Sequence, residues 1–179
     1  RKNETIMFTF KQVSYHFSTI FSQLLPAANA HLVLKRNSES KPTGISDEDI
    51  SSFTEVGIKV TFNKEDQNFV EIGQLSGGQK TLVTLALIFA FQKCDPVPFY
   101  LFDEVDQALD PYHRQTFSKM LGELSIKRQF IVTTFRPEIL SHNPTCFRAE
   151  FKHRISTITP ITVSTALSLV DIDSQMGPV

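Results

Sequence analysis

Residues 75–79, Leu-Ser-Gly-Gly-Gln, have the composition of an anion-binding helix start. Ser76 and Gln79 have the spacing of a capping box, directly before an apolar stretch that predicts a helix. Gly77 and Gly78 would let a phosphate approach the backbone without a Cβ in the way. The free N–H groups and partial positive charge of a helix N-terminus favour a phosphate at that position. A glycine-rich loop that only caps a helix fits these residues equally well.

A second motif is an apolar stretch that ends in two adjacent carboxylates, Asp103 and Glu104. Its residues 99–102 are Phe-Tyr-Leu-Phe, which predicts a buried parallel strand. Ligands of open α/β sheets bind beyond the C-terminal strand ends, so Asp103 would be suited to hold Mg²⁺ through water. Glu104, one residue further, could orient or deprotonate an attacking water. Acids are also common at solvated strand ends, but two phosphate-directed motifs in this order argue against coincidence.

Two further stretches follow these motifs. In the turn Ala108-Leu109-Asp110, Asp110 is a candidate N-cap, with Pro111 at the first helical position. Taken alone, that pattern indicates capping only. Residues 129–134 predict another buried strand, which ends in hydroxyl side chains.

The elements that must position these motifs form an α/β pattern. Residues 4–25 carry apolar side chains at intervals of three and four, which predicts a helix with one apolar face. Residues 79–93 are apolar on nearly all sides, which predicts a buried helix. The remaining predicted helices span 112–124, 137–140 and 162–170, and the predicted strands span 31–35, 57–62, 69–72, 99–102, 129–134, 146–151 and 155–158. The central alternation of strands and helices predicts a mostly parallel sheet flanked by helices. We expect a surface loop at 37–52 and a frayed tail from Asp171.

The composition is that of one globular domain with a formal net charge of −1, which neither predicts nor excludes a nucleic-acid partner. Cys94 and Cys146 form no CxxC pair, which favours inert thiols in a reducing, intracellular setting. No apolar run is long enough to span a bilayer, so no membrane partner is expected. The chain does not begin with Met, and we interpret it as a piece of a longer protein.

Together, these motifs resemble an ABC-type ATPase. The wording QLSGGQKTLVTLALIFAFQKCDPVPFYLFDEVDQALD, followed by QFIVTTFRPEIL, resembles more specifically the cohesin subunits of the SMC (structural maintenance of chromosomes) family. The stretch TFKQVSYHFSTIF is similar to the point where the coiled coil of that family re-enters the head. The resemblance covers most of residues 1–160 and implies the C-terminal half of an ATPase head. Its implied parts are a coiled-coil neck helix at 1–25, an ABC-type lobe at 30–160, and a C-terminal helix and tail at 161–179.

The resemblance also implies roles for the motifs. The loop residues that would contact the γ-phosphate of ATP bound on a partner head are Ser76, Gly77, Gly78 and Gln79. Asp103 would serve Mg²⁺, Glu104 would activate water, and Asp110 would lie at the head–head contact. The implied cofactors are ATP and Mg²⁺. The implied partners are the N-terminal half of the same head, a second cohesin SMC head, a kleisin subunit and non-specific DNA, in the nucleus and on chromosomes.

Two departures from the general ABC pattern qualify these roles. Most ABC ATPases place a histidine after the strand that here ends at Thr134, whereas this chain has Phe135, as cohesin has. The resemblance therefore implies that Phe135 occupies a nucleotide-contact position, but its side chain has no group that could bond the γ-phosphate. The sequence also contains no GxxxxGK[ST] loop. In SMC proteins that loop lies at the other end of the polypeptide, beyond a long coiled coil, so its absence supports a C-terminal half-head.

Three other interpretations stay open at this point. A transporter nucleotide-binding domain would carry the GxxxxGK[ST] loop upstream and usually the histidine. A DNA-repair ATPase of the same coiled-coil class would also carry the histidine. The chain could instead be mainly a docking module for a kleisin or for DNA, with phosphate contacts at Lys35-Arg36 and at residues 152–154, although such basic clusters are more often solvated surface.

Overall fold

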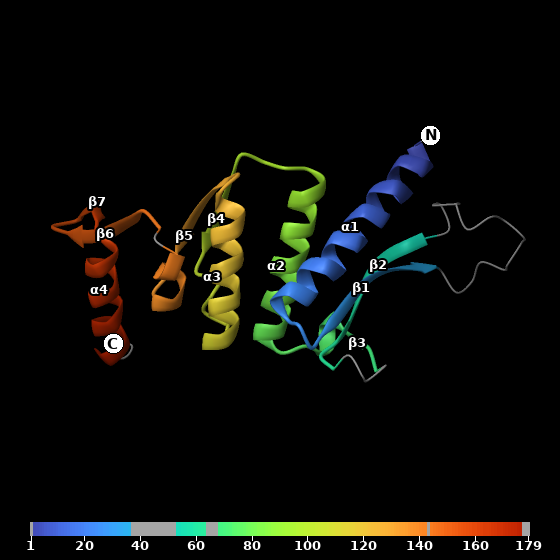
Figure 1. Ribbon diagram of the computed structural model, residues 1–179, viewed down its shortest axis with the longest axis horizontal. Coiled ribbons are helices and arrows are strands. Elements are labelled where there is room, and N and C mark those ends of the chain that lie inside the picture. The colour runs from blue at the N-terminus through green and yellow to red at the C-terminus, as the bar shows by residue number, and fades with distance from the viewer. Residues whose placement is uncertain (1, 37–52, 64–67, 143, 177–179) are drawn as a thin grey trace, which may run out of the picture. The chain divides into compact units, whose positions relative to one another are not determined.

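The computed structural model describes residues 2–36, 53–63, 68–142 and 144–176 of the 179-residue chain (Figure 1). The chain divides into two compact units, residues 1–97 and residues 98–179. The loop expected at 37–52 lies outside the described residues. Among the described residues, no helix combines the length and the apolar character that crossing a membrane requires.

The first unit begins with the predicted amphipathic helix, α1 (Lys2–Leu24). Its C-terminal half supplies the buried side chains, including Phe17 and Phe21, whose rings lie 6.1 Å apart. α1 packs against strand β1 (Asn29–Arg36) and helix α2 (Gly77–Cys94), as Figure 1 shows. The expected helix is therefore confirmed, but its apolar stripe is a core surface only from Val13 onward, since Ile6 near its start is 44% exposed.

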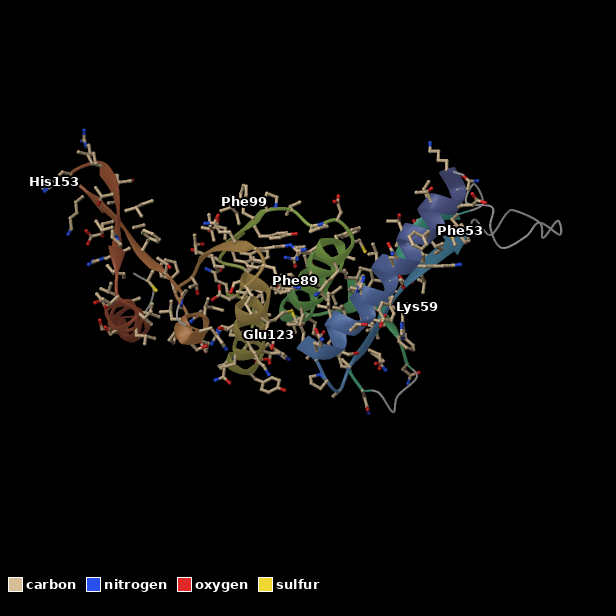
Figure 2. All side chains as sticks on the ribbon, turned by 45° about the horizontal axis from the view of Figure 1, so that its top comes forward. Phe53, Lys59, Phe89, Phe99, Glu123 and His153 are labelled. Atoms are coloured by element: carbon tan, nitrogen blue, oxygen red, sulfur yellow. The ribbon has the colours of Figure 1, made fainter. Side chains whose placement is uncertain are left out.

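Three antiparallel strands complete the sheet of this unit, in the order β1-β2-β3. Strand β2 (Phe53–Thr61) pairs along the whole of β1, and β3 (Val70–Glu71) is short because a 3₁₀ helix, η2 (Ile72–Gln74), follows at once. The strand expected at 69–72 is thus only partly formed. The prediction that helix α2 is buried on nearly all sides is only partly confirmed. Seven of its 18 residues are buried, including Phe89, which has no exposed surface (Figure 2), whereas Phe91 is 53% exposed.

The second unit contains the predicted strand–helix–strand arrangement. Strand β4 (Phe99–Asp103) is parallel to β5 (Gln129–Thr133), and helix α3 (Pro111–Ser125) connects them. One face of this sheet is packed against α3. The Phe102 ring lies 6.1 Å from the ring of Phe117 on that helix, and Phe117 is fully buried.

The expectation that both strands are buried on both faces is wrong for this chain. The opposite face of the sheet carries large apolar side chains that are 52%, 68% and 46% exposed, namely Phe99, Leu101 and Ile131. The physical reason is that side chains alternate between the two faces of a strand, and α3 can cover only one of them.

The unit ends with a 3₁₀ helix, an antiparallel hairpin and a helix. These are η3 (Pro137–His142), β6 (Cys146–Lys152), β7 (Ile155–Ile161) and α4 (Val163–Met176). A small apolar cluster of Leu140, Cys146 and Ala166 joins them. Figure 2 labels His153 at the hairpin turn, where His153 and Arg154 have positive φ angles of 51° and 64°. The tail expected to fray from Asp171 instead continues as helix to Met176.

The α/β class is confirmed, but the predicted parallel sheet is limited to β4 and β5 among the described strands. The hairpin β6–β7 turns within two residues, and such a connection permits only antiparallel pairing. Parallel strands need a longer crossover, which α3 provides between β4 and β5.

Candidate nucleotide site

The loop of residues 75–79, here called the signature loop, forms the predicted capping box at the start of α2. The Ser76 Oγ accepts a hydrogen bond from the Gln79 N–H at 3.3 Å, and the Gln79 Oε1 accepts one from the Ser76 N–H at 2.9 Å. A Cβ placed on Gly77 would meet nothing within 4 Å, so the space beside this residue is open. The loop thus combines a well-ordered helix start, whose first N–H groups point out of the helix, with room for an approaching anion.

The two carboxylates lie at the C-terminal end of β4, where the sequence places them. Asp103 is paired with Thr133 of β5, and the Thr133 hydroxyl donates a hydrogen bond to Asp103 Oδ1 at 2.5 Å. The same hydroxyl oxygen accepts the Glu104 N–H at 3.1 Å, and that N–H also lies 3.2 Å from the Thr133 carbonyl oxygen. One threonine therefore fixes both acidic residues.

Glu104 has a left-handed backbone conformation, with φ of 48°. For a residue with a side chain this conformation is uncommon and costs energy, and such strain concentrates at functional sites. It turns the chain out of the strand direction directly after Asp103. The side-chain amide of Gln107 then donates a hydrogen bond to Glu104 Oε2.

Sequence reasoning did not single out Thr133, Thr134, Asp106 or Gln107. Asp106 is a buried carboxylate, 1% exposed, and it accepts a hydrogen bond from the Thr134 hydroxyl. The Thr134 Oγ1 in turn accepts the Arg136 N–H at 2.9 Å. The available signals were the two hydroxyl residues at the end of the predicted strand 129–134 and the two polar residues 106–107 between Glu104 and Asp110. Neither signal indicates a partner, because the two segments lie far apart in the sequence.

Asp110 is the N-cap of α3, as predicted, and Pro111 begins the helix. Its Oδ1 accepts the His113 N–H at 2.9 Å, and its Oδ2 lies 2.6 Å from His113 Nδ1. The backbone hydrogen bond from His113 is the main cause that lowers the pKa of Asp110 below its usual value. Asp110 therefore already has a structural role, and any contact with a second head would be additional.

The remaining predicted positions are also located. Phe135 directly follows the Thr134 hydroxyl and is 57% exposed. Asp103, Glu104, Asp110 and Phe135 belong to the second unit, and Ser76–Gln79 belong to the first. Burial raises the pKa of the Cys94 and Cys146 thiols, which fits the expectation that both are inert.

The donor set at β4 fits Mg²⁺, which prefers hard oxygen ligands and keeps several waters. Asp103 supplies a carboxylate and Thr133 a hydroxyl. Within the described part of the chain, no cluster of three His, Cys, Asp or Glu side chains could hold a metal ion. A magnesium ion here would be held by Asp103 through water, because Mg²⁺ usually keeps several of its waters.

Comparison with known proteins identifies the family. Residues 7–157 match the family model described as the RecF/RecN/SMC N terminal domain. The chain is 40% identical to "Structural maintenance of chromosomes protein 3" of Caenorhabditis elegans, a match that covers 99% of this chain and 14% of that protein. The chain spans 12–16% of the length of the curated relatives it matches.

Two solved structures share the fold, at 28% and 29% sequence identity. One, from work described as "Structural biochemistry of ATP-driven dimerization and DNA stimulated activation of SMC ATPases", is 28% identical, with a TM-score of 0.79 over 95% of this chain and 96% of that one. The other is an Smc head domain bound to the C-terminal domain of ScpA, from Pyrococcus furiosus. It is 29% identical, with a TM-score of 0.74 over 96% of this chain and 40% of that one. Given the family match, these likenesses and the acidic strand end, the chain belongs to the SMC family of ATPases, as a head segment of the structural maintenance of chromosomes protein 3 type.

Proposed function

We propose that this chain is the C-terminal half of a cohesin SMC ATPase head. With its N-terminal half it would bind and hydrolyse ATP, and its signature loop would engage ATP on a partner head. Engagement of the two heads would then drive chromosome cohesion and DNA loop organisation in the nucleus. The observation that carries the proposal is the pair Asp103 and Glu104 at the end of a parallel strand, held by the single hydroxyl of Thr133.

The two carboxylates suit different tasks. Asp103, with Thr133 beside it, would hold Mg²⁺ through water, and the ion would neutralise phosphate charge. Glu104 lies one residue beyond the strand and would accept a proton from the attacking water. Ser76–Gln79 would bind the γ-phosphate held by the other head, because the loop presents N–H groups beside open space. Asp110 would lie at the contact between the heads, and Phe135 would flank the nucleotide without bonding it.

The exposed face of the β4–β5 sheet supports the N-terminal half as a partner. Parallel sheets are normally covered on both faces, and a two-stranded sheet is marginal by itself. Here three large apolar residues of one face, Phe99, Leu101 and Ile131, are about half exposed or more. Burying them would contribute on the order of 1 kcal/mol each or more. A second half that brings further strands and a covering helix would account for this surface.

Further partners follow from the related proteins. A second SMC head is supported by the relative studied for ATP-driven dimerization, and a kleisin by the head domain bound to ScpA. Non-specific DNA would be a third partner, and the relative studied for DNA-stimulated activation of SMC ATPases supports it. ATP and Mg²⁺ would be the cofactors.

The test is Glu104→Gln in the head reassembled from this chain and its N-terminal half. Glutamine keeps the size of the side chain but cannot take a proton, so single-turnover hydrolysis in this site should fall by about 10²-fold or more. ATP binding should survive, and the engaged dimer should accumulate in size-exclusion chromatography with ATP. The site on the partner head must be silenced, since its turnover would hide the loss.

Glu123→Gln is the matched control, because Glu123 is exposed in the last turn of α3, whereas Glu104 precedes the start of that helix (Figure 2 labels Glu123). It should leave hydrolysis and dimerisation unchanged. Hydrolysis by Glu104→Gln at the rate of the unmodified head would refute the catalytic role. The docking interpretation, in which this chain mainly binds a kleisin or DNA, would then be the better one.

A further inference from the structure

Gln107 makes two hydrogen bonds to the same residue. Its side-chain Nε2 donates to Glu104 Oε2, and its backbone N–H donates to the Glu104 carbonyl oxygen at 3.1 Å. Residues 104–107 therefore form a turn whose first and last residues are joined by two hydrogen bonds, one between side chains and one between backbone groups. The amide reaches the carboxylate of the residue proposed as the general base.

The turn that carries Gln107 is anchored on both sides. Asp106, directly before it, is 1% exposed and bonded by the Thr134 hydroxyl at the end of β5. Leu109, two residues after it, is 4% exposed, and its N–H donates to the Asp106 carbonyl oxygen at 3.1 Å. Glu104 itself is fixed through its N–H to Thr133. Because both ends of the bond are attached to fixed backbone, the Gln107 amide can hold the Glu104 carboxylate in one orientation.

The chemistry of this contact leaves the base able to act. An ionised carboxylate has about four lone-pair positions on two oxygens, and the amide occupies one of them on Oε2. Oε1 stays available to accept a proton from water. The Gln107 side-chain amide neither gains nor loses a proton at neutral pH, so the contribution of Gln107 is to position the Glu104 carboxylate.

We propose that Gln107 is a positioning residue for ATP hydrolysis, and that it orients the Glu104 carboxylate toward the attacking water. The inference rests on the proposed function, because it assumes that Glu104 is the base. A misdirected base would slow the chemical step, since small displacements from the reactive geometry cost large factors in rate. Nucleotide affinity would not change, because Gln107 would not touch the phosphates.

The experiment uses the complete SMC protein assembled with its partner head, with the partner's own site silenced. Gln107→Leu keeps the approximate size and removes the donor, and Gln107→Glu places a like charge beside Glu104. For Gln107→Leu we expect single-turnover hydrolysis to fall by about tenfold, the scale of one lost hydrogen bond to a charged group. The KM for ATP and the ATP-dependent dimer should be unchanged, and Gln107→Glu should lose more. Gln115→Leu, an exposed glutamine on α3, is the matched control and should hydrolyse normally.

A double-mutant cycle separates positioning from a general structural effect. In the Glu104→Gln background, Gln107→Leu should cause no further loss, because the base it positions is already gone. An equal loss in both backgrounds would overturn the proposal, as would normal hydrolysis by Gln107→Leu when Glu104→Gln alone is impaired. That second result would leave the function of Glu104 intact. Normal hydrolysis by Glu104→Gln alone would instead overturn the proposed function itself, and the positioning role with it.

Discussion

The largely buried ion pair between Arg114 of α3 and Glu138 of η3 offers the sharpest test of how the second unit is held together. Both the Nε and the Nη2 of Arg114 contact Glu138 Oε1, at 3.1 Å and 3.0 Å. In a third contact, the Arg114 Nη1 donates a hydrogen bond to the Leu109 carbonyl oxygen at 2.8 Å. The arginine thus ties the turn before α3 to the segment that follows β5.

Its burial sets the expected magnitude. The side chains of Arg114 and Glu138 are only 11% and 15% exposed, so solvent screens the pair weakly. Arg114→Met would leave the Glu138 charge without its cation, and removing one partner of a buried pair costs about 3–5 kcal/mol. The residual exposure places the expected loss near the lower end, at about 3 kcal/mol.

The double variant Arg114→Met/Glu138→Met should be more stable than Arg114→Met alone. With both charges gone, no ion is left buried, and a well-packed apolar pair is often close to neutral. The Leu109 carbonyl would still lack its donor, which costs about 1–3 kcal/mol. We therefore expect the double variant to recover part, but not all, of the lost stability.

Urea unfolding of the 179-residue chain, followed by far-ultraviolet circular dichroism, measures these differences. The chain has no tryptophan, so indole fluorescence is not an available probe. Lys119→Met, which removes an exposed cation from the same helix, should change the free energy of unfolding by less than about 0.5 kcal/mol. If Arg114→Met is as mild as this control, or if the double variant is less stable than Arg114→Met, the reasoning is refuted.

Two further predictions concern the helix starts. Ser76→Arg should abolish the ATP-dependent dimer of reassembled heads, because the arginine side chain would fill the open space beside the loop. The fold should survive, since the lost helix cap costs only about 1 kcal/mol. Normal dimerisation on size-exclusion chromatography would contradict the role of the loop. The pKa of Asp110 is lowered from its usual 3.8, chiefly by the His113 N–H, so its ionised form stabilises the fold above about pH 4 and this contribution is lost as the pH falls through the lowered pKa. Asp110→Asn should keep the cap but lose the contribution of the charge at pH 7, and it should weaken this acid dependence. Asp110→Ala should also lose the cap, at a cost of about 1 kcal/mol at pH 7. Equal acid dependence of unfolding in Asp110→Asn and the unmodified chain would contradict this.

The sequence alone determined the local features of this protein. Capping residues and apolar spacing act within a few positions, so the starts of α2 and α3 and the helix α1 could be predicted from neighbouring residues. The strand that carries Asp103, and the parallel partner that follows it, could be predicted for the same reason. The glycine-rich loop 75–79 and the acidic strand end 103–104 are likewise short stretches of sequence, and their resemblance to the SMC family could be seen in the sequence alone.

Only the tertiary structure decided which distant residues act together. Thr133 lies thirty positions after Asp103, and nothing in either segment shows that one hydroxyl would bond both acidic residues. Parallel pairing brings them to the same sheet edge, and the positive φ of Glu104 then sets where its carboxylate and Gln107 meet. The exposed face that includes Leu101 also escaped prediction, because an apolar strand has the same sequence whether its second face is covered by its own chain or by another.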